Sequence, residues 1–354
     1  MTMNKVTLWG AIVLFFSMIN ACQYPVSPTS LPESQRFLVI DAELTEDYGK
    51  VKVTYTLEDV TPQGGYLFPD PPQAVAYVLD SHGNRTDFAT NGSVNYSFKG
   101  IVGETYKLYV VADGQSYESS AETMPACPEL DSVTPLYTRE SFRDPGDLNY
   151  DGFDVYAQLT DVAGQEHYYQ WDWKHYHRVF GCAIVSENGQ DVQVPCTPYD
   201  CWGIDFNTRI IVQSDKLRDG QPIAHRVVRV PFAQPPNKYY LRVEQRSITP
   251  SVFSYLKSLE TQTQNSGSLF DIPAQTQFNP NVQNVDNPSE KILGVFSVFS
   301  SRYKIIYIDM RQEIPGVQVK VLPNPRPFTS NPLAQAPCTE TIYRTQIRPE
   351  GWED

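Results

Sequence analysis

The stretch EHYYQWDWKHYHRVF, residues 166–180, decides the fold that the sequence predicts. Bulky and mostly aromatic side chains occupy every second position from His167 to His177, with a more polar set between them. This alternation is typical of a β-strand that packs one face on a core and turns the other toward water. We therefore predict a large sheet with one wet face around this strand.

Shorter alternating segments that precede this strand predict a separate sandwich over residues 36–126. Val51, Val53 and Tyr55 share one face of a predicted strand, and turn residues near Asp80 separate neighbouring segments. Six or seven short strands within about 90 residues are typical of an immunoglobulin-like sandwich. We expect this sandwich to form the N-terminal domain.

The rest of the chain predicts a larger β domain over residues 127–320 that carries one short helix. Thr249 is a suitable N-cap and Pro250 fits the first helical position, so we expect a helix near 250–264. The prolines that follow predict an extended arm over residues 321–354. With 22 Tyr, 17 Phe and 28 Pro in 354 residues, the chain is predicted to be mostly β.

The N-terminal segment up to Cys22 predicts a secretory signal peptide, residues 1–21. Lys5 precedes an apolar run of 14 residues, shorter than the roughly 20 that span a bilayer. The ending Ala21-Cys22 resembles the bacterial lipobox, so we expect Cys22 to carry an anchoring lipid. Residues 22–35 are rich in proline and serine and predict a flexible tether. The alternative is an ordinary cleaved signal followed by a chance cysteine.

The charge of the chain limits the partners that it can bind. The formal net charge is −13 and only 19% of residues are charged, which argues against nucleic-acid binding through a basic surface. The same acidity argues against a polybasic grip on anionic lipid. Membrane attachment is therefore expected to depend on Cys22.

Five further cysteines are candidates for disulfides, because cysteines outside the cytoplasm tend to pair. An odd number leaves at least one unpaired, so two disulfides are the most that we expect. One should form within the local group of three, and the two others are placed to close a long loop. The spacing C-x₂-C that favours zinc is absent. The local group is Cys182, Cys196 and Cys201, and the two others are Cys127 and Cys338.

Two patterns suggest metal binding, and each has a simpler interpretation. Asp147, Asn149 and Asp151, followed by glycine, resemble the start of a calcium loop, but the twelfth position is Gln158 and not a bidentate glutamate. A solvated turn explains the same residues. His175 and His177 share a strand face that His167 also joins, yet no third ligand is evident from the sequence, so we expect them to complete an aromatic face.

Trp171 and Trp173 are likewise predicted to belong to the core, with a sugar-stacking platform as the alternative. The sequence contains no nucleophile elbow, zinc-protease motif, P-loop or dinucleotide fingerprint. We therefore nominate no catalytic residue and no cofactor, and predict that the protein is not an enzyme.

An ordered series of blocks carries a family resemblance over about residues 37–352. The blocks are YYQWDW at 168–173, SITPSVFSYLKSLETQTQNSGSLFDIP at 247–273, NVDNPSEKILGVFSV at 284–298 and RPEGW at 348–352. Together they resemble the Bacteroidetes outer-membrane lipoproteins catalogued as domain of unknown function 4249. Relatives often have a cysteine pair in the C-terminal tail, where this chain has only Cys338.

The resemblance implies an accessory role at the outer membrane, because genes of this family often neighbour those of SusC-like TonB-dependent transporters. We expect a binding partner of such a transporter, on either the periplasmic or the cell-surface face. The alternatives are an envelope enzyme that acts on glycan or peptide, and a structural adhesin. Ser132 lies in Asp131-Ser132-Val133, which matches the short O-glycosylation signal of Bacteroidetes.

Overall fold

The computed structural model describes most of the chain from Arg36 onward. Phe37–Thr56 and Asp70–Asp354 form one compact unit, and a small hairpin of β3 (Asp59–Val60) and β4 (Tyr66–Leu67) belongs to another. Among the described residues no helix has the length and apolar character to cross a membrane. The predicted signal peptide, Cys22 and the tether lie outside these residues. The described ranges are 36–56, 59–60, 66–67, 72–143, 148–179, 181–187, 190–195, 200–232, 238–264, 277–311, 314–322, 338 and 340–353.

Two sheets enclose the first hydrophobic core. Alternate residues of each sheet, such as Ile40, Val51 and Leu108, are buried in it and leave polar neighbours outside. The first sheet has the order β21-β1-β2-β7 with β22 also on β1, and the second β20-β9-β8-β5-β6 with β10 on β8. Their bounds are β1 Leu38–Leu44, β2 Gly49–Tyr55, β5 Ala74–Asp80, β6 Arg85–Phe88, β7 Asn91–Asn95, β8 Thr105–Ala112, β9 Gln115–Ser119, β10 Glu122–Thr123, β20 Val282–Asn284, β21 Ile292–Leu293 and β22 Phe296–Val298.

Three strands of this first sandwich come from residues 282–298, which the sequence had placed in the second domain. β20 pairs with β9, while β21 and β22 pair parallel to β1. Phe296 is fully buried in the first core, and Asn281 donates its side-chain amide to the buried Glu122 at 2.9 Å. Pairing over such a distance in the sequence leaves no local pattern, so periodicity did not reveal it. The immunoglobulin-like topology and the predicted domain bounds stay predictions.

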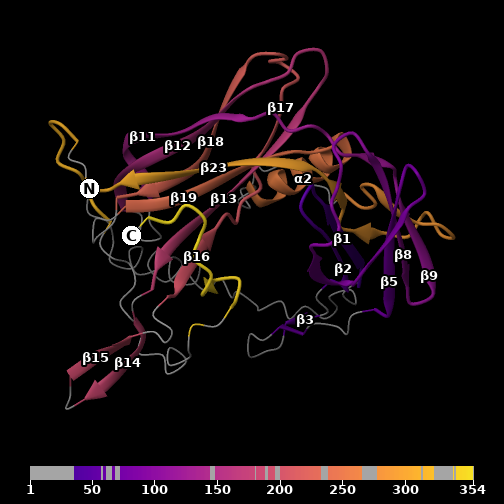
Figure 1. Cartoon of the computed structure of the whole chain (residues 1–354), viewed down its shortest axis with the longest axis horizontal. Helices are drawn as coiled ribbons and strands as arrows, with labels where there is room; N and C mark the ends of the chain where they lie inside the picture. Colours follow the sequence, from indigo (N-terminus) through magenta and orange to yellow (C-terminus); the bar gives the residue numbers. More distant parts are fainter. Residues whose placement is uncertain are drawn as a thin grey trace, which may run out of the picture. The chain divides into compact units, whose positions relative to one another are not determined.

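Two further sheets enclose the second core, and Figure 1 shows β23, β19 and β13 side by side in one of them. Buried residues of both sheets meet there, among them Val155, Trp171 and Leu241. The orders are β11-β12-β18 and β23-β19-β13-β16-β24, with β17 on β13, and β14 pairs with β15. The bounds are β11 Leu130–Arg143, β12 Asn149–Thr160, β13 Tyr168–Arg178, β14 Gly181–Glu187, β15 Gln190–Pro195, β16 Trp202–Phe206, β17 Val212–Ser214, β18 Pro222–Pro231, β19 Lys238–Ser247, β23 Ser300–Asp309 and β24 Arg344–Thr345.

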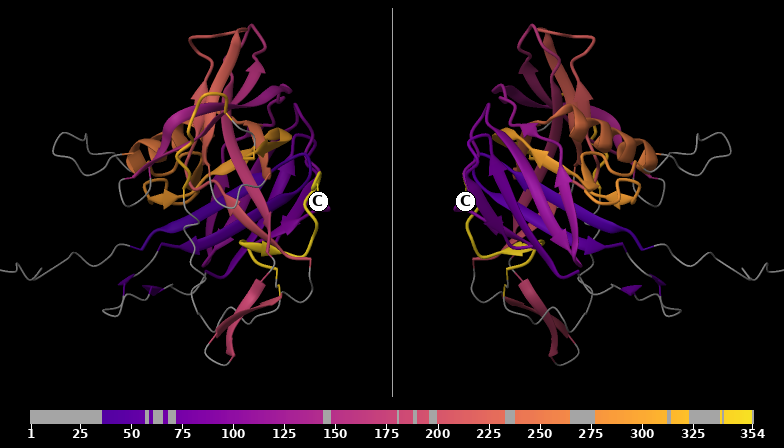
Figure 2. Two further views of the ribbon diagram at one scale, coloured as in Figure 1. Left: turned by 90° about the vertical axis from the view of Figure 1, so that its left-hand side faces the viewer. Right: turned by 90° about the vertical axis from the view of Figure 1, so that its right-hand side faces the viewer.

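The alternation that we predicted for residues 166–180 is present in β13. Tyr169 and Trp171 are fully buried, whereas Gln170 and Asp172, each next to one of them, are only half-buried. The predicted mostly β fold is confirmed, and so is the helix. Among the described residues the one helix is α2 (Pro250–Gln264), and Figure 2 shows it beside the sheets.

α2 begins where the sequence predicted and covers a third, smaller core. Thr249 precedes its first residue, and the Thr249 carbonyl accepts a hydrogen bond from the Phe253 amide at 2.9 Å. Val252 is almost fully buried, and it packs with Val212 and Phe299. The helix is therefore fixed by its apolar stripe against β17 and the residues before β23.

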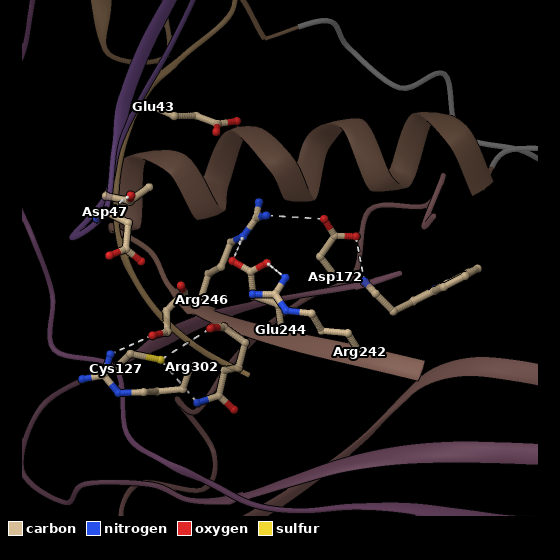
Figure 3. A network of polar contacts seen from close by, with 12 residues as sticks. Glu43, Asp47, Cys127, Asp172, Arg242, Glu244, Arg246 and Arg302 are labelled. Carbon is tan, nitrogen blue, oxygen red and sulfur yellow. Dashed lines mark hydrogen bonds and ion pairs between the residues drawn. The ribbon is translucent and has the colours of Figure 1, made fainter. Parts of the chain in front are cut away.

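The face of the central sheet that we predicted to be wet is covered by α2, and it carries a ladder of largely buried charged residues (Figure 3). Asp172 and Glu244 are direct cross-strand partners, a like-charge pairing that destabilises a sheet by itself. Arg246 bonds both carboxylates, with contacts of 3.2 Å to Glu244 and 3.4 Å to Asp172, and Arg242 contacts Glu244 at 3.4 Å. Burial acts to raise the pKa of Glu244, but these two arginines outweigh it and lower that pKa.

The end of the chain packs on the same sheet, where the sequence predicted an arm. β24 pairs with β16, and Trp352 contacts the rings of Trp202 and Tyr240. A disulfide joins Cys201 to Cys338 across a sequence separation of 137 residues. Residues 323–337 lie outside the described part.

The predicted pairing of Cys127 with Cys338 is wrong. Cys127 is a buried free thiol, and burial raises its pKa. Of the local group, Cys201 is already bonded to Cys338. Cys182 belongs to β14, whose side chains are not described, and Cys196 lies outside the described residues, so their pairing stays a prediction.

Peptide mapping without reduction should recover two disulfides, Cys201–Cys338 and Cys182–Cys196, and one free thiol at Cys127. The second is expected by elimination among the five cysteines after Cys22, because Cys201 and Cys338 are bonded to each other and Cys127 is a buried free thiol. A closed loop as long as that between Cys201 and Cys338 is worth roughly 4–5 kcal/mol in the chain-entropy treatment. Recovery of Cys338 linked to Cys127 or Cys182 would refute this assignment.

Replacing Glu244 with glutamine should lower the free energy of unfolding by about 1–3 kcal/mol at neutral pH, because it removes the charge between two arginines. The folded pKa of Glu244 lies below its ordinary value of 4.5. Its ion pairs therefore stabilise the fold above that value and are lost as the pH falls through the lower folded pKa. Urea unfolding at several pH values should show the gap between variant and wild type closing in that acidic range.

Glu353→Gln is the matched control, because Glu353 pairs with Lys238 at 2.8 Å while its side chain is 58% exposed. We expect a change within about 0.5 kcal/mol there. An equal effect of both substitutions, or a gap at Glu244 that does not depend on pH, would contradict the proposed role of the ladder.

Candidate functional site: an arginine-lined cleft

A cleft of about 700 Å³ lies between the second pair of sheets and the end of α2. Its walls come from the last residues of β11, from β18, from the turn 207–211 and from Trp173 of β13. Glu260 and Thr263 of α2 border it. Among the described lining residues are four arginines: Arg143, Arg209, Arg226 and Arg229.

A β-bulge in β18 brings two of these arginines to one carboxylate. The register of β12 and β18 shifts between Val155 and Tyr156, so that Arg226 and Arg229, three apart, both reach Asp154 of β12. The contacts are 3.5 Å and 3.1 Å, and the Asp154 side chain is only 9% exposed. In a regular strand these arginines would point to opposite faces; the bulge re-aims one of them.

The turn before β17 positions a third arginine. Asn207 accepts a hydrogen bond from the Arg209 amide at 3.0 Å and donates its own side-chain amide to the Arg209 carbonyl at 2.7 Å. The backbone amide of Asn207 in turn donates to the Trp173 carbonyl of β13. Arg209 is exposed at the rim of the cleft.

The two tryptophans of β13 have different roles. Trp171 is fully buried and stacks on His225, with 4.7 Å between ring centroids and 1° between planes, so its core assignment is correct. Trp173 is half-buried and lines the cleft. A flat aromatic side chain next to guanidinium groups suits a ligand that carries both a ring and an anionic group.

The charges of the cleft favour an anionic ligand. Asp154 lies against two of the four arginines, and Glu260 also pairs with Lys257. Guanidinium forks bind carboxylate, phosphate and sulfate groups in bidentate fashion, so the arginines here select for such groups. An acidic protein with such a local excess of arginine gathers anions at one place that its net charge would otherwise repel.

A second polar cluster, Asp161, His167 and Asp215, is closed to solvent. His167 Nδ1 lies 3.2 Å from Asp161 and 3.3 Å from Asp215, and neither carboxylate is exposed. Asp161 also accepts bonds from the Tyr169 hydroxyl and the Gly220 amide, while Asp215 accepts the His167 amide. The cluster holds two loops together and no substrate can reach it.

The calcium candidates do not form a loop site in the described residues. Asn149 and Asp151 belong to β12, and Asp147 lies outside the described part. Asp151 is 1% exposed and accepts hydrogen bonds from the Tyr137 hydroxyl and from the amides of Glu140 and Lys320. Burial acts to raise its pKa, but these bonds outweigh it and lower that pKa. The carboxylate therefore joins the register shift of β11 between Thr138 and Phe142 to the backbone at Lys320.

The remaining predicted residues lie apart from the cleft lining. Ser132 is half-buried on β11 and donates its hydroxyl to Gln158 of the neighbouring strand. His175 and His177 lie on β13 toward its C-terminal end, next to Asp205 of β16. The arginines were missed because they are scattered in the sequence, and only the bulge and the turn bring them together.

Arg209→Ala should weaken the binding of sulfated or carboxylated polysaccharide about tenfold, since it removes one charged hydrogen-bonding group. Dextran sulfate and alginate are suitable probes, with neutral dextran as the uncharged comparison in calorimetry. Arg311→Ala is the matched control, because Arg311 is 57% exposed and pairs with Asp309 outside the cleft. Equal losses for the two variants, or equal binding of neutral dextran, would rule out the cleft as an anion site.

Comparison with known proteins identifies the family of the chain but gives no activity for it. No curated protein matches the chain. A family described as a domain of unknown function, DUF4249, matches residues 24–305, which include all the cleft-lining residues and all of the first and third cores. This confirms the resemblance that the sequence blocks gave, and the chain therefore belongs to the DUF4249 family.

Proposed function

We propose that this protein is a non-catalytic lipoprotein of the outer membrane that binds an anionic ligand in the arginine-lined cleft. In this proposal it serves as accessory or binding partner of a TonB-dependent β-barrel transporter. The observation that carries it is the cleft itself, with four arginines and Trp173 around about 700 Å³. Such a cavity has the size and the convergent polar groups of a ligand site.

The anchor and the family support the location. A lipid on Cys22 keeps the domain at the membrane surface, which raises its effective concentration beside any barrel there. The frequent position of DUF4249 genes next to transporter genes supplies the kind of partner, by analogy only. Either face of the outer membrane fits these observations.

The rival functions receive less support from the geometry. An envelope enzyme needs accessible acid and base groups, and the paired carboxylates Asp161 and Asp215 are buried under their own hydrogen bonds. The cleft does offer Glu260, but this carboxylate pairs with Lys257.

The full chain with a C-terminal tag should co-purify with a TonB-dependent transporter from native membranes in mild detergent, in near-stoichiometric amount. Cys22→Ser should move the protein to the soluble fraction and abolish this recovery, because two acyl chains give stable anchoring where one is marginal. Cys127→Ser is the control and should stay in the membrane fraction. Recovery of the tagged protein alone would contradict the proposal. So would retention of the Cys22→Ser variant in the membrane fraction through high-salt and carbonate washes.

A further inference from the structure

His175 and His177 of β13 face a carboxylate on the neighbouring strand. In the antiparallel β13–β16 ladder His175 is paired with Asp205, and His177 with Gly203. Directly opposite residues bring their Cβ atoms to about 5 Å, and residues two apart share a face. One ligand atom from each of His175, His177 and Asp205 lies within 4.8 Å of the other two. The third ligand that the sequence lacked therefore comes from cross-strand register.

The ring of His175 has the tautomer that metal ligation needs. Its Nδ1 lies 2.6 Å from the Tyr240 carbonyl oxygen, which only accepts hydrogen bonds. Nδ1 therefore carries the proton and Nε2 keeps the lone pair. Histidine ligands typically donate their second ring N–H to a carbonyl in this way. The ring plane is fixed by stacking on Tyr239, with centroids 3.7 Å apart.

His177 and Asp205 complete the set at the surface. His177 Nδ1 lies 3.6 Å from an Asp205 carboxylate oxygen, and the side chains are 38% and 42% exposed, so an ion can reach them. The His177 ring packs on Gly203, where an added Cβ would lie 2.4 Å from its Nε2. Glycine at this position leaves the space that the ring occupies.

We propose that His175, His177 and Asp205 bind a first-row transition-metal dication such as Zn²⁺. Two imidazoles and one carboxylate suit zinc and its neighbours, whereas calcium and magnesium take oxygen ligands. Three protein ligands leave a position for water or for an exogenous group. The ion would tie β13 to β16 next to the Cys201–Cys338 disulfide, and this site is independent of the arginine-lined cleft.

The buried cluster of His167 is the competing set of ligands, and its contacts disfavour it. Its Nδ1 faces both Asp161 and Asp215, and the carboxylates also accept bonds from a hydroxyl and two amides. A metal there would have to displace these bonds without solvent access. At His175, by contrast, only Nδ1 is bonded to the Tyr240 carbonyl, so a metal can bind Nε2 without breaking that hydrogen bond.

The test is titration of the purified full chain, freed of metal by chelator, with Zn²⁺ in calorimetry and Co²⁺ in visible absorption. Loss of a second-sphere partner costs 10–100-fold in metal affinity, so loss of a ligand should cost about 100-fold or more. We therefore expect Asp205→Asn and His177→Gln each to weaken Zn²⁺ binding by about 100-fold or more. His167→Gln should bind as the wild type does, and so should His82→Gln, which alters an exposed histidine 3.5 Å from Glu104.

A geometric variant separates ligation from folding. Gly203→Ala keeps all three ligands but places a methyl group against the His177 ring, so it should also weaken Zn²⁺ binding while near-ultraviolet circular dichroism of the metal-free protein stays native. Unchanged affinity in Asp205→Asn would overturn the proposal. So would a thiolate charge-transfer band with Co²⁺, which would assign the metal to Cys127, or loss of binding in His167→Gln.

Discussion

The backbone register of β13 is the constraint on which the rest of the second half depends. Because side chains alternate across a strand, a slip of one residue would turn Trp171 away from the second core and draw Asp172 into it. Any other register would expose Trp171 and bury the charge of Asp172 without its ion pairs, so the observed register is strongly favoured. Pairing on both edges, with β19 on one side and β16 and β17 on the other, leaves the strand no freedom to shift.

The same register sets the positions of three chemically different groups. On the face toward α2 it places Asp172 opposite Glu244, and Arg246 offsets the repulsion between the two carboxylates. On the other face it directs Trp173 into the cleft and places His175 opposite Asp205. The candidate anion site and the candidate metal site are thus consequences of one strand pairing. Neither needs strained backbone at β13.

Local features of the fold could be predicted from the sequence, and long-range ones could not. Alternation along residues 166–180 and the Thr249-Pro250 signal are properties of neighbouring residues, so the strand and the helix were predicted correctly. The return of residues 282–298 to the first sandwich and the Cys201–Cys338 bond join distant segments and leave no periodicity. The cleft was missed because a bulge in β18, invisible in the sequence, aligns its arginines.

The register of β13 is tested most directly by paired cysteines on the face that carries Asp172 and Glu244. Lys174 of β13 is the cross-strand partner of Arg242 in β19. The double variant Lys174→Cys with Arg242→Cys should form a disulfide on mild oxidation, seen as a linked peptide by mass spectrometry. Lys174→Cys with Val243→Cys should not, because Val243 points to the opposite face. Linkage in the second pair and not in the first would contradict the register, and with it both candidate sites.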